Sequence, residues 1–449
     1  MAVPKKDVIA AKEYVLKTAK EQHIKSIRLW FTDILGFLKS FAIPVEELEG
    51  ALEDGVGFDG SSIQGFVRID ESDMIAMPDP ATFSIIPWGS EEQASSARMF
   101  CDIYNIDKKP FEGDPRYVLK KNLKKAADMG YTYNVGPELE YFYFKDNKGT
   151  EPLDVGGYFD MDPHDAAMDL RRDTVQALDG MGIRVDKSHH EGAASQHEID
   201  MRYDDALTMA DNVMTYRLVV KEIAIKHGVY ATFMPKPVYG INGSGMHVHQ
   251  SLFKGKTNAF FDSKSDYYLS KVGRSFLAGL LKYAPEFTSV TNQWVNSYKR
   301  LVPGYEAPVY ISWAQRNRSD LIRLPAYKVG KEKETRFEIR SPDPAANPYL
   351  CFSVLLAAGL AGIKEGLVPP PSIEENVYDM TEEKRIKRGV GLLPGSLWEA
   401  LMLTEKSNLV REALGDHLFQ AFISNKKVEW DRYRVFVTDY EIEKYLPVL

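Results

Sequence analysis

The sequence contains very little cysteine and no long apolar segment, and both absences narrow the classes of protein it can encode. Only Cys101 and Cys351 occur among 449 residues, without a CxxC pair. A disulfide framework is therefore not expected, and a reducing, cytoplasmic location is predicted. No uncharged apolar run reaches the roughly 20 residues of a membrane span. The longest such run, Tyr349 to Ile363, is predicted to be a buried helix, and no membrane association is expected.

The sequence also lacks an excess of positive charge. Lysine and arginine number 56 against 64 aspartates and glutamates, which gives a formal net charge of −8. A general nucleic-acid binder would carry a clustered basic surface, so small molecules are the expected partners and nucleic acid is not. The sequence also lacks a GxxxxGK[ST] segment, which excludes a nucleotide site of the P-loop type.

The length of the chain and the order of its predicted elements indicate two domains. A chain of 449 residues is too long for one ordinary core. The first 22 residues, in which lysines interrupt the apolar positions, resemble an amphipathic helix rather than a signal peptide. A hairpin is predicted around Asp33–Gly36 and a strand over Arg98–Tyr104. We expect domains at 1–107 and 108–449, with helices over Asp114–Met129 and Asp162–Met181.

Several predicted strands carry ionisable side chains on one face, because side chains at i and i+2 of a strand point the same way. Glu138 alternates with apolar neighbours in GPELEYFYF, and Glu338 does so in RFEIR. The segment SGMHVHQSLF aligns two histidines in the same way, and HHEGAASQHEIDM adds two glutamates across a bend. One such segment alone is more simply a solvated sheet face. The residues concerned are Glu138, Glu140, Glu191, Glu198, His247, His249, Arg336, Glu338 and Arg340.

Four such segments in one chain predict a shared cavity. If these strands are neighbours, five glutamates and one histidine converge where carboxylates stay ionised only beside cations. Oxygen-rich ligation with a single imidazole favours Mg²⁺ or Mn²⁺ over zinc. Six ligands exceed what one Mg²⁺ normally takes, so two metal ions are expected.

Arginines gather among apolar and aromatic residues between Arg300 and Arg340. A solvated basic face is the simpler alternative, but such faces are usually lysine-rich. Guanidinium forks suit carboxylate and phosphoryl oxygens. Metal ions and converging arginines together predict phosphoryl transfer. The arginines are Arg300, Arg318, Arg323, Arg336 and Arg340.

Seven segments, in order and spread over most of the chain, resemble the signatures of the type I glutamine synthetases of bacteria and archaea. They are FDGSS (58–62), GPELEYF (136–142), HHEGAASQHEID (189–200), NGSGMHVHQS (242–251), NSYKRLVPGYEAP (296–308), NRSDLIRLP (317–325) and RFEIRSPDPAANPYL (336–350). The resemblance implies an α+β fold, with a small N-terminal β-grasp-like domain and a large catalytic domain built on a curved antiparallel sheet flanked by helices.

The resemblance also implies a reaction and a set of site residues. The γ-phosphoryl group of ATP would pass to the side chain of glutamate, and ammonia would attack the resulting acyl phosphate. Arg318 and Arg323 would meet the phosphoryl group. One metal site would comprise Glu140, Glu191 and Glu198, and the other Glu138, His247 and Glu338. Glutamate would be held by Asn242, Gly243, Arg300 and Arg340, and ATP by Tyr203, His249, Ser251, Lys333 and Arg336.

Ammonium requires a negative pocket that binds it and then removes a proton. By resemblance this pocket comprises Asp59, Ser62, Tyr158, Glu191 and Glu306. Glu306 lies in VPGYEAP, a segment that could close as a lid or form an ordinary turn. Because relatives place the loop of Asp59 against an adjacent subunit, the resemblance implies a dodecamer of two stacked hexameric rings.

Smaller features of the sequence bear on how the enzyme is regulated and on which other functions are possible. Gly192 and Ala194 stand where relatives more often carry valine and proline, which would loosen the bend. The compact length resembles the subgroup controlled by small effectors such as glutamine or 2-oxoglutarate, with Arg68 as a feedback residue or a surface ion pair. Tyr378 lacks the adenylylation motif. A glutamate–amine ligase and a non-catalytic nitrogen sensor are the alternatives; both would be expected to lose residues that this chain keeps.

Overall fold

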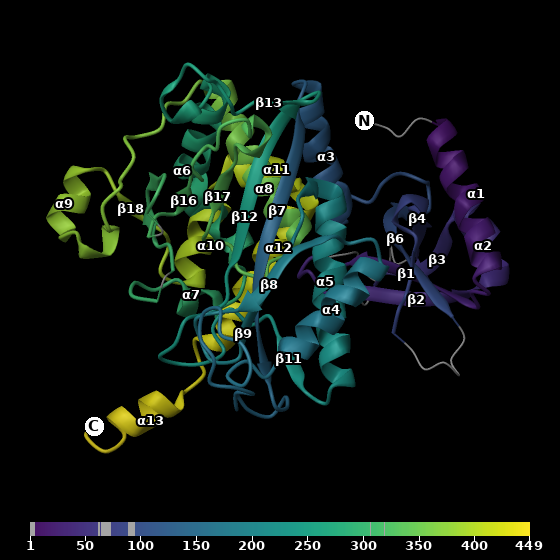
Figure 1. Ribbon diagram of the computed structural model, residues 1–449, viewed down its shortest axis with the longest axis horizontal. Helices are drawn as coiled ribbons and strands as arrows, with labels where there is room; N and C mark the ends of the chain where they lie inside the picture. Colours follow the sequence, from purple (N-terminus) through teal and green to yellow (C-terminus); the bar gives the residue numbers. More distant parts are fainter. Residues whose placement is uncertain (1–4, 62, 64–72, 89–94, 306, 318) are drawn as a thin grey trace.

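The computed structural model describes residues 5–61, 63, 73–88, 95–305, 307–317 and 319–449. A small N-terminal part and a larger part, each with its own sheet and core, lie side by side (Figure 1). The helices are α1 Lys5–Glu21, α2 Leu48–Asp54, α3 Pro115–Asp128, α4 Met168–Gly180, α5 Ala206–Lys226, α6 Lys271–Thr291, α7 Ser297–Arg300, α8 Pro348–Glu365, α9 Glu382–Lys387, α10 Leu397–Glu405, α11 Asn408–Leu414, α12 Asp416–Tyr433 and α13 Asp439–Tyr445.

The strands form one sheet in each part and a short pair between β14 and β18. The small sheet has the order β2-β1-β6-β4-β3, with β5 on β6, and the large sheet has the order β15-β16-β17-β12-β7-β9-β8, with β10 and β11 on β7 and β13 on β12. The strands are β1 Ser26–Thr32, β2 Leu38–Pro44, β3 Val56–Asp59, β4 Asp73–Pro78, β5 Ser84–Ile85, β6 Ser96–Asn105, β7 Thr132–Phe144, β8 Val185–His190, β9 Gln196–Met201, β10 Asp204–Asp205, β11 Tyr230–Thr232, β12 Met246–Lys254, β13 Thr257–Asn258, β14 Tyr310–Ile311, β15 Trp313–Ala314, β16 Ile322–Arg323, β17 Phe337–Ile339 and β18 Gly391–Leu392.

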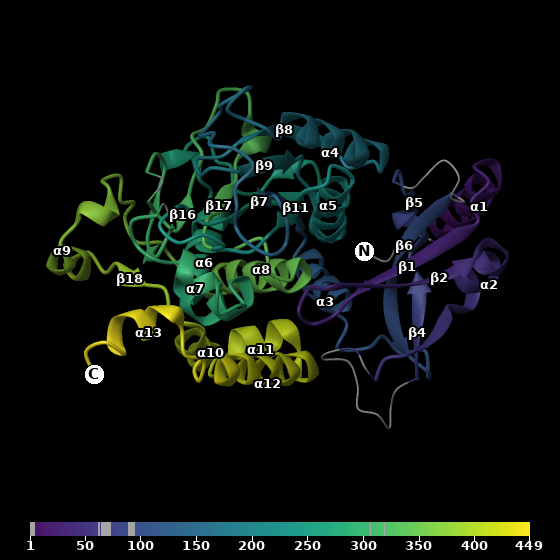
Figure 2. The same cartoon turned by 90° about the horizontal axis from the view of Figure 1, so that it is seen from below.

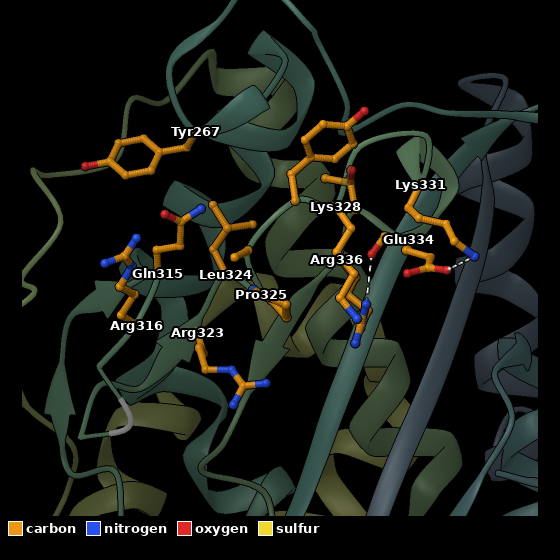
Figure 3. A pocket seen from close by; sticks show the side chains of 13 residues that line it. Tyr267, Gln315, Arg316, Arg323, Leu324, Pro325, Lys328, Lys331, Glu334 and Arg336 are labelled. Carbon is orange, nitrogen blue, oxygen red and sulfur yellow. Dashed lines mark hydrogen bonds and ion pairs between the residues drawn. The ribbon is translucent and has the colours of Figure 1, made fainter.

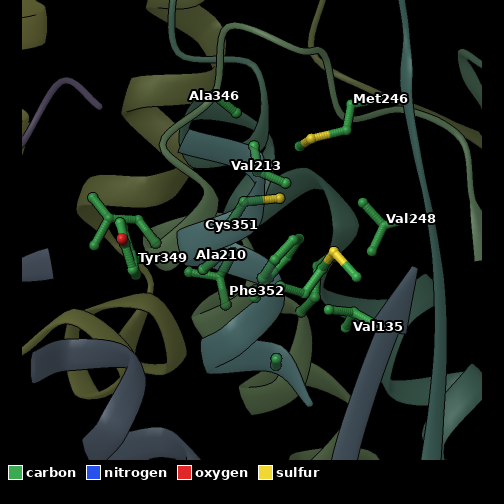
Figure 4. Close-up of a cluster of buried hydrophobic side chains, with 14 of the residues drawn as sticks. Val135, Ala210, Val213, Met246, Val248, Ala346, Tyr349, Cys351 and Phe352 are labelled. Atoms are coloured by element: carbon green, nitrogen blue, oxygen red, sulfur yellow. The ribbon is translucent and has the colours of Figure 1, made fainter. Parts of the chain in front are cut away.

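The large sheet is antiparallel along β16-β17-β12-β7-β9-β8, as predicted, and its outermost pair, β15 with β16, is parallel. One face of this sheet packs on helices. Val135 of β7 and Val248 of β12 meet Phe352 of α8 in a fully buried cluster (Figure 4). Beneath α6 and α8 lies a further layer made of α10, α11 and α12 (Figure 2). The other face of the central strands is left to carry polar side chains.

Most predicted elements are confirmed. The hairpin forms as β1 and β2, the strand as β6, the helix over 114–129 as α3, and the apolar run as α8. Helix α8 is long and apolar enough to span a membrane, but 72% of its apolar window is buried inside the protein, so it is a core helix. Its ends have clear signals: Asn347 caps the first turn, Pro348 follows at the first helical position, and Gly366 ends it in the left-handed region.

The helix predicted over Asp162–Met181 is wrong at its start, because α4 begins only at Met168. Two N–H groups that would enter a longer helix bind carboxylates instead. Ala166 donates to Asp154 Oδ2 and Ala167 donates to Asp165 Oδ1. Aspartate side chains compete in this way for backbone donors and favour turns over helix.

One buried guanidinium fastens the two parts together. Arg116 of α3 donates to Asp79 and Asp102 of the small part and to Asp211 of α5, at 2.6–3.3 Å. Arg116 is 3% exposed. A buried charge of this kind is tolerated only when it is fully paired, and removing one partner typically costs about 3–5 kcal/mol. The mutual orientation of the two parts is therefore fixed by polar contacts as well as by packing.

Candidate active site

Three neighbouring strands bring together the first acidic group. In the register of the sheet, His247 of β12 stands opposite Glu138 of β7, and Glu338 lies on β17 at the other side of β12. His247 Nδ1 is 3.7 Å from Glu138 Oε2 and 3.6 Å from Glu338 Oε1. Ligating atoms of all three lie within 4.8 Å of one another. We call these three residues the strand group; it is the set that the sequence predicted for one metal site.

Cations and imidazoles surround the strand group and keep its carboxylates charged. Burial alone would raise the pKa of Glu138, but His249 and His247 outweigh it and lower that pKa below its usual range. Burial likewise opposes ionisation of Glu338, whereas the nearby histidines and arginines lower its pKa. Arg323 Nε lies 2.8 Å from Glu338 Oε2. The strand group is therefore negatively charged at neutral pH.

A second acidic group forms where the chain turns from β8 to β9. Glu191 N–H donates to Gln196 C=O at 2.7 Å and closes the bend, and Glu198 follows on β9. His189, opposite Glu198 in the register, lies 2.8 Å through Nε2 from Glu191 Oε1. Ligating atoms of His189, Glu191 and Glu198 lie within 4.8 Å of one another. We call these three residues the bend group.

The bend group differs by one residue from the predicted metal set, because His189 lies within it and Glu140 stands at its edge. The Glu140 carboxylate accepts from the Gln196 side chain at 3.0 Å and from Gly245 N–H at 2.9 Å. Sequence reasoning did not single out His189. The signal was present, since His189 and Glu191 alternate in the segment HHE.

At the carboxyls around the bend, nearby positive groups do not offset burial: burial and Glu191 raise the pKa of Glu140 more than Arg300 and Arg340 lower it. Burial, and then the charge of Glu191, raise the pKa of Glu140 to about 8. Burial also raises the pKa of Glu198 well above its ordinary value, with Asp200 adding to the effect. Buried carboxyls that repel one another bind a proton or a cation. Carboxylates with an imidazole fit a hard divalent ion such as Mg²⁺ or Mn²⁺, so the donor set suits the metal chemistry predicted from sequence.

Both groups line a single cavity of about 510 Å³. Arg300 is packed against its wall, and its guanidinium donates to the carbonyls of Arg340 and Ser341. A side chain at position 245 would not fit, because a Cβ there would lie 2.5 Å from Arg300 Nη2. The predicted substrate residues in this cavity are Tyr158, Glu191, Asn242, Gly243, Arg300 and Arg340.

A second, larger cavity of about 890 Å³ shares Glu138 and Arg323 with the first. All of the residues predicted to hold ATP line it. They are Tyr203, His249, Ser251, Lys333 and Arg336. His249 Nε2 lies 3.0 Å from Glu138 Oε1, and Arg336 Nε donates to His249 Nδ1 at 3.2 Å, so the wall between the cavities is tied together.

A third cavity of about 440 Å³ adjoins the second and is rich in cations. Arg316, Arg323, Lys328 and Arg336 surround it (Figure 3). Arg323 lines all three cavities. Its guanidinium therefore places a positive charge where the three cavities meet.

Some predicted residues stand elsewhere. Asp59 ends β3 in the small part, where it accepts from Ser61 N–H at 2.8 Å, and it lines none of these three cavities. The fold of a single chain therefore does not bring Asp59 to the acidic groups. Four predicted residues lie outside the described part of the chain. They are Ser62, Arg68, Glu306 and Arg318.

The arrangement is that of an ATP-dependent ligase. Two acidic groups suited to divalent cations share one cavity with arginines, and a larger cavity that is also lined by cationic side chains adjoins it. This combination serves phosphoryl transfer without a P-loop.

Comparison with known proteins identifies the family. The family model described as "Glutamine synthetase, catalytic domain" matches residues 112–445, and that described as "Glutamine synthetase, beta-Grasp domain" matches residues 23–106. A glutamine synthetase of Mycolicibacterium smegmatis is 55% identical over 97% of this chain and 99% of its own length. One of Methanosarcina mazei is 52% identical over 98% of both chains.

Solved structures agree in fold. One titled as a GmaS complex with ADP superimposes with a TM-score of 0.88 at 30% identity, over 96% of this chain and 99% of its own. A Plasmodium falciparum glutamine synthetase gives 0.86 at 26% identity, over 97% and 98%. The chain belongs to the glutamine synthetase family and is an ATP-dependent glutamate–ammonia ligase. The predicted fold, a β-grasp domain followed by the family's catalytic domain, is confirmed.

Proposed function

We propose that the two acidic groups each hold one divalent cation, Mg²⁺ or Mn²⁺, during synthesis of glutamine. Glu138, His247 and Glu338 serve one site. Glu140, Glu191 and Glu198 serve the other, with His189 beside them. The observation that carries this proposal is the convergence of both groups on one cavity, with pKa values at the bend that call for a cation. Bound divalent ions neutralise phosphate oxygens and polarise the transferred phosphoryl group.

ATP occupies the larger cavity in this proposal, and glutamate occupies the smaller one. The phosphates of ATP reach the place where the cavities meet. There Arg323, together with Arg318, stabilises charge on the transferred group. In the first step, a side-chain carboxylate oxygen of glutamate bonds to the γ-phosphorus of ATP. The bond from that phosphorus to the bridging oxygen breaks, and ADP leaves. The nucleotide contacts are Tyr203, His249, Ser251, Lys333 and Arg336, and the glutamate contacts are Asn242, Gly243, Arg300 and Arg340.

Ammonium is bound and deprotonated at the opposite end of the smaller cavity. Tyr158 and Glu191, which line it, form the ammonium pocket together with Asp59 and Ser62 from another subunit. The nitrogen then bonds to the acyl carbon and inorganic phosphate leaves. Glu306 accepts a proton and closes the site as a lid. Water would otherwise hydrolyse the acyl phosphate, so closure protects the intermediate.

The position of Asp59, in the small sheet and away from the cavities, supports a homo-oligomer in which active sites form between subunits. The C-terminal part points the same way. Phe436, Ile442 and Leu446 are exposed on and around α13, which extends away from the rest of the chain (Figure 1). Such apolar surface usually marks an interface. We infer a cytoplasmic dodecamer of two hexameric rings, with domains at 1–107 and 108–449.

The test is ATP hydrolysis by the purified oligomer with glutamate and either ammonium or a panel of amines. We expect turnover with ammonium, dependent on Mg²⁺ or Mn²⁺. Turnover with methylamine or a polyamine but not with ammonium would overturn the assignment of the ammonium pocket. Glu306→Ala should cut glutamine formation while ATP binding stays nearly intact. Arg68→Ala should alter the response to glutamine or 2-oxoglutarate while basal activity is kept.

A further inference from the structure

Behind the bend group lies another set of ionisable side chains, which the reaction does not use. Asp154, Asp165, His190 and His197 are all buried, with potential ligating atoms within 4.8 Å of one another. Arg171 supplies the positive charge there, because its guanidinium donates to both oxygens of Asp165 and lies 2.9 Å from His197 Nδ1. A cation that belongs to the chain thus stands where a metal ion would otherwise be needed.

Asp154 connects this buried set to the bend itself. Its Oδ1 accepts from Ser195 N–H at 2.8 Å and lies 3.0 Å from His190 Nε2. Its own N–H, together with that of Leu153, donates to Ser195 Oγ at 3.1 and 2.6 Å. Ser195 has a positive φ of 59°, which a residue other than glycine adopts only when its surroundings hold it there. These contacts therefore fix the turn that separates Glu191 from Glu198.

The same residue also anchors the loop that carries Tyr158. Gly156 N–H donates to Asp154 Oδ1 at 3.3 Å, and Phe159 N–H donates to His190 C=O at 3.1 Å. The space between them is filled: a Cβ at Gly156 would lie 2.7 Å from His190 Nε2. The loop over 153–159 and the turn over 190–195 are consequently held as one unit.

We propose that Asp154 is a positioning residue that sets the distance between the bend group and Tyr158. It acts through His190 and Ser195 and touches neither metal nor substrate. The proposal rests on the proposed roles of the bend group in metal binding and of Tyr158 in ammonium binding. Outer residues of this kind typically change metal affinity or activity by about 10- to 100-fold when they are lost.

The test uses the assembled full-length enzyme with Asp154→Ala. Mn²⁺ binding is followed by titration calorimetry without substrates, and KM is measured separately for ammonium and for ATP. We expect one of the two Mn²⁺ ions to bind at least tenfold more weakly, the KM for ammonium to rise at least tenfold, and the KM for ATP to stay within twofold. Equal weakening of both Mn²⁺ ions, or no change in either, would overturn the proposal.

Two further variants keep the test informative if Asp154→Ala folds poorly. Gly156→Ala forces a methyl group against His190 and should reproduce the selective loss. Asp154→Asn retains an oxygen for Ser195 and His190 but loses the acceptor for Ala166 N–H, so it should bind Mn²⁺ more tightly than Asp154→Ala. Asn122→Ala is the control. It removes one buried hydrogen bond within α3, to Val118 C=O, and one from α3 to Ala413 C=O of α11, so it should lower the melting temperature without separating the two Mn²⁺ affinities.

Measurements on the wild-type enzyme distinguish a failure of this proposal from a failure of the proposed metal and ammonium sites. Two Mn²⁺ ions bound per wild-type chain verify the metal sites without any substrate, and ammonium-dependent turnover verifies the pocket. The competing interpretation is that the buried set itself binds a metal ion, and metal analysis of the purified protein tests it. His197 Nε2, which is buried without a hydrogen-bond partner among the described residues, is the atom such a metal would need. A third tightly bound metal ion per chain would overturn the structural role.

Discussion

The two acidic groups of the cavity have similar ligands but are built in different ways. The strand group stands on β7, β12 and β17, whose register fixes the spacing of Glu138, His247 and Glu338 through the sheet. The bend group depends on a turn between β8 and β9 and on side chains behind it. Strand pairing alone specifies the first group, whereas the second needs a supporting layer.

The groups also differ in charge. Histidines and arginines surround the strand group and lower the pKa values of Glu138 and Glu338, but burial and neighbouring carboxyls raise those of Glu198 and Glu140. The strand group is prepared for a cation before one arrives. The bend group must release protons when it binds one.

The largest effect is expected from Glu338→Gln in the strand group. The change leaves Arg323 and Arg340, which lie 2.8 and 3.8 Å from the carboxylate, without their negative partner. Glutamine synthesis should fall by roughly 10³-fold, as it does when a preorganised charge is removed from an active site. The metal-free melting temperature should fall too. Glu365→Gln, an exposed change at a distant ion pair, is the control and should leave both values unchanged.

Glu198→Gln in the bend group should cut activity by roughly 10²-fold but spare stability. Burial and Asp200 raise the pKa of Glu198 well above its ordinary value, so the metal-free protein disfavours the charged carboxylate, and glutamine resembles the neutral form. The expected result is a metal-free melting temperature equal to or above that of the wild type, by differential scanning calorimetry. If the metal-free melting temperature fell as much as it does in Glu338→Gln, the proposed electrostatic difference between the two groups would be wrong.

Metal binding at the bend should depend on pH more strongly than binding at the strands. A carboxyl whose pKa is raised to about 8 favours the folded metal-free protein at low pH, and this contribution is lost as pH rises through about 8. The metal-free melting temperature should therefore decline from pH 6 to 8.5, and Mn²⁺ should suppress the decline. Calorimetry in two buffers of different ionisation enthalpy should show protons released by one Mn²⁺ ion only. Proton release shared equally by both ions would contradict the contrast.

The smallest effect is expected from Gly192→Ala in the bend. Among the described residues, a Cβ there meets only the Asn242 side chain, at 3.7 Å, and the backbone lies outside the left-handed region. Alanine should restrict the unfolded chain and stabilise the protein by about 0.4–1 kcal/mol. Activity should stay within twofold, and Mn²⁺ should bind the bend slightly more tightly. Weaker binding would show that the bend uses the freedom of glycine.

The two-residue period of a strand predicted that the members of the strand group converge on one cavity with the other glutamates, and the family resemblance singled them out as one metal set. Glu138, His247 and Glu338 each sit in an alternating segment, and neighbouring strands bring them together. His189 was missed as a member of the bend group, and the start of α4 was predicted too early. The second error arises because Asp154 and Asp165 take backbone donors that a pattern assigns to a helix. The first was avoidable, since His189 alternates with Glu191 in the sequence. Asp59 stands on the small sheet and lines none of the three cavities, because the fold of one chain sets it apart from the acidic groups.

The guanidinium of Arg116 has a consequence for assembly. Carboxylates from both parts of the chain form ion pairs with it. A change in the tilt between the two parts would therefore leave at least one of these charges without its partner. In the proposed ring, each small domain must reach the cavity of the next subunit. The angle at which successive subunits meet, and hence the number that closes a circle, would then be set within each chain before any two of them associate.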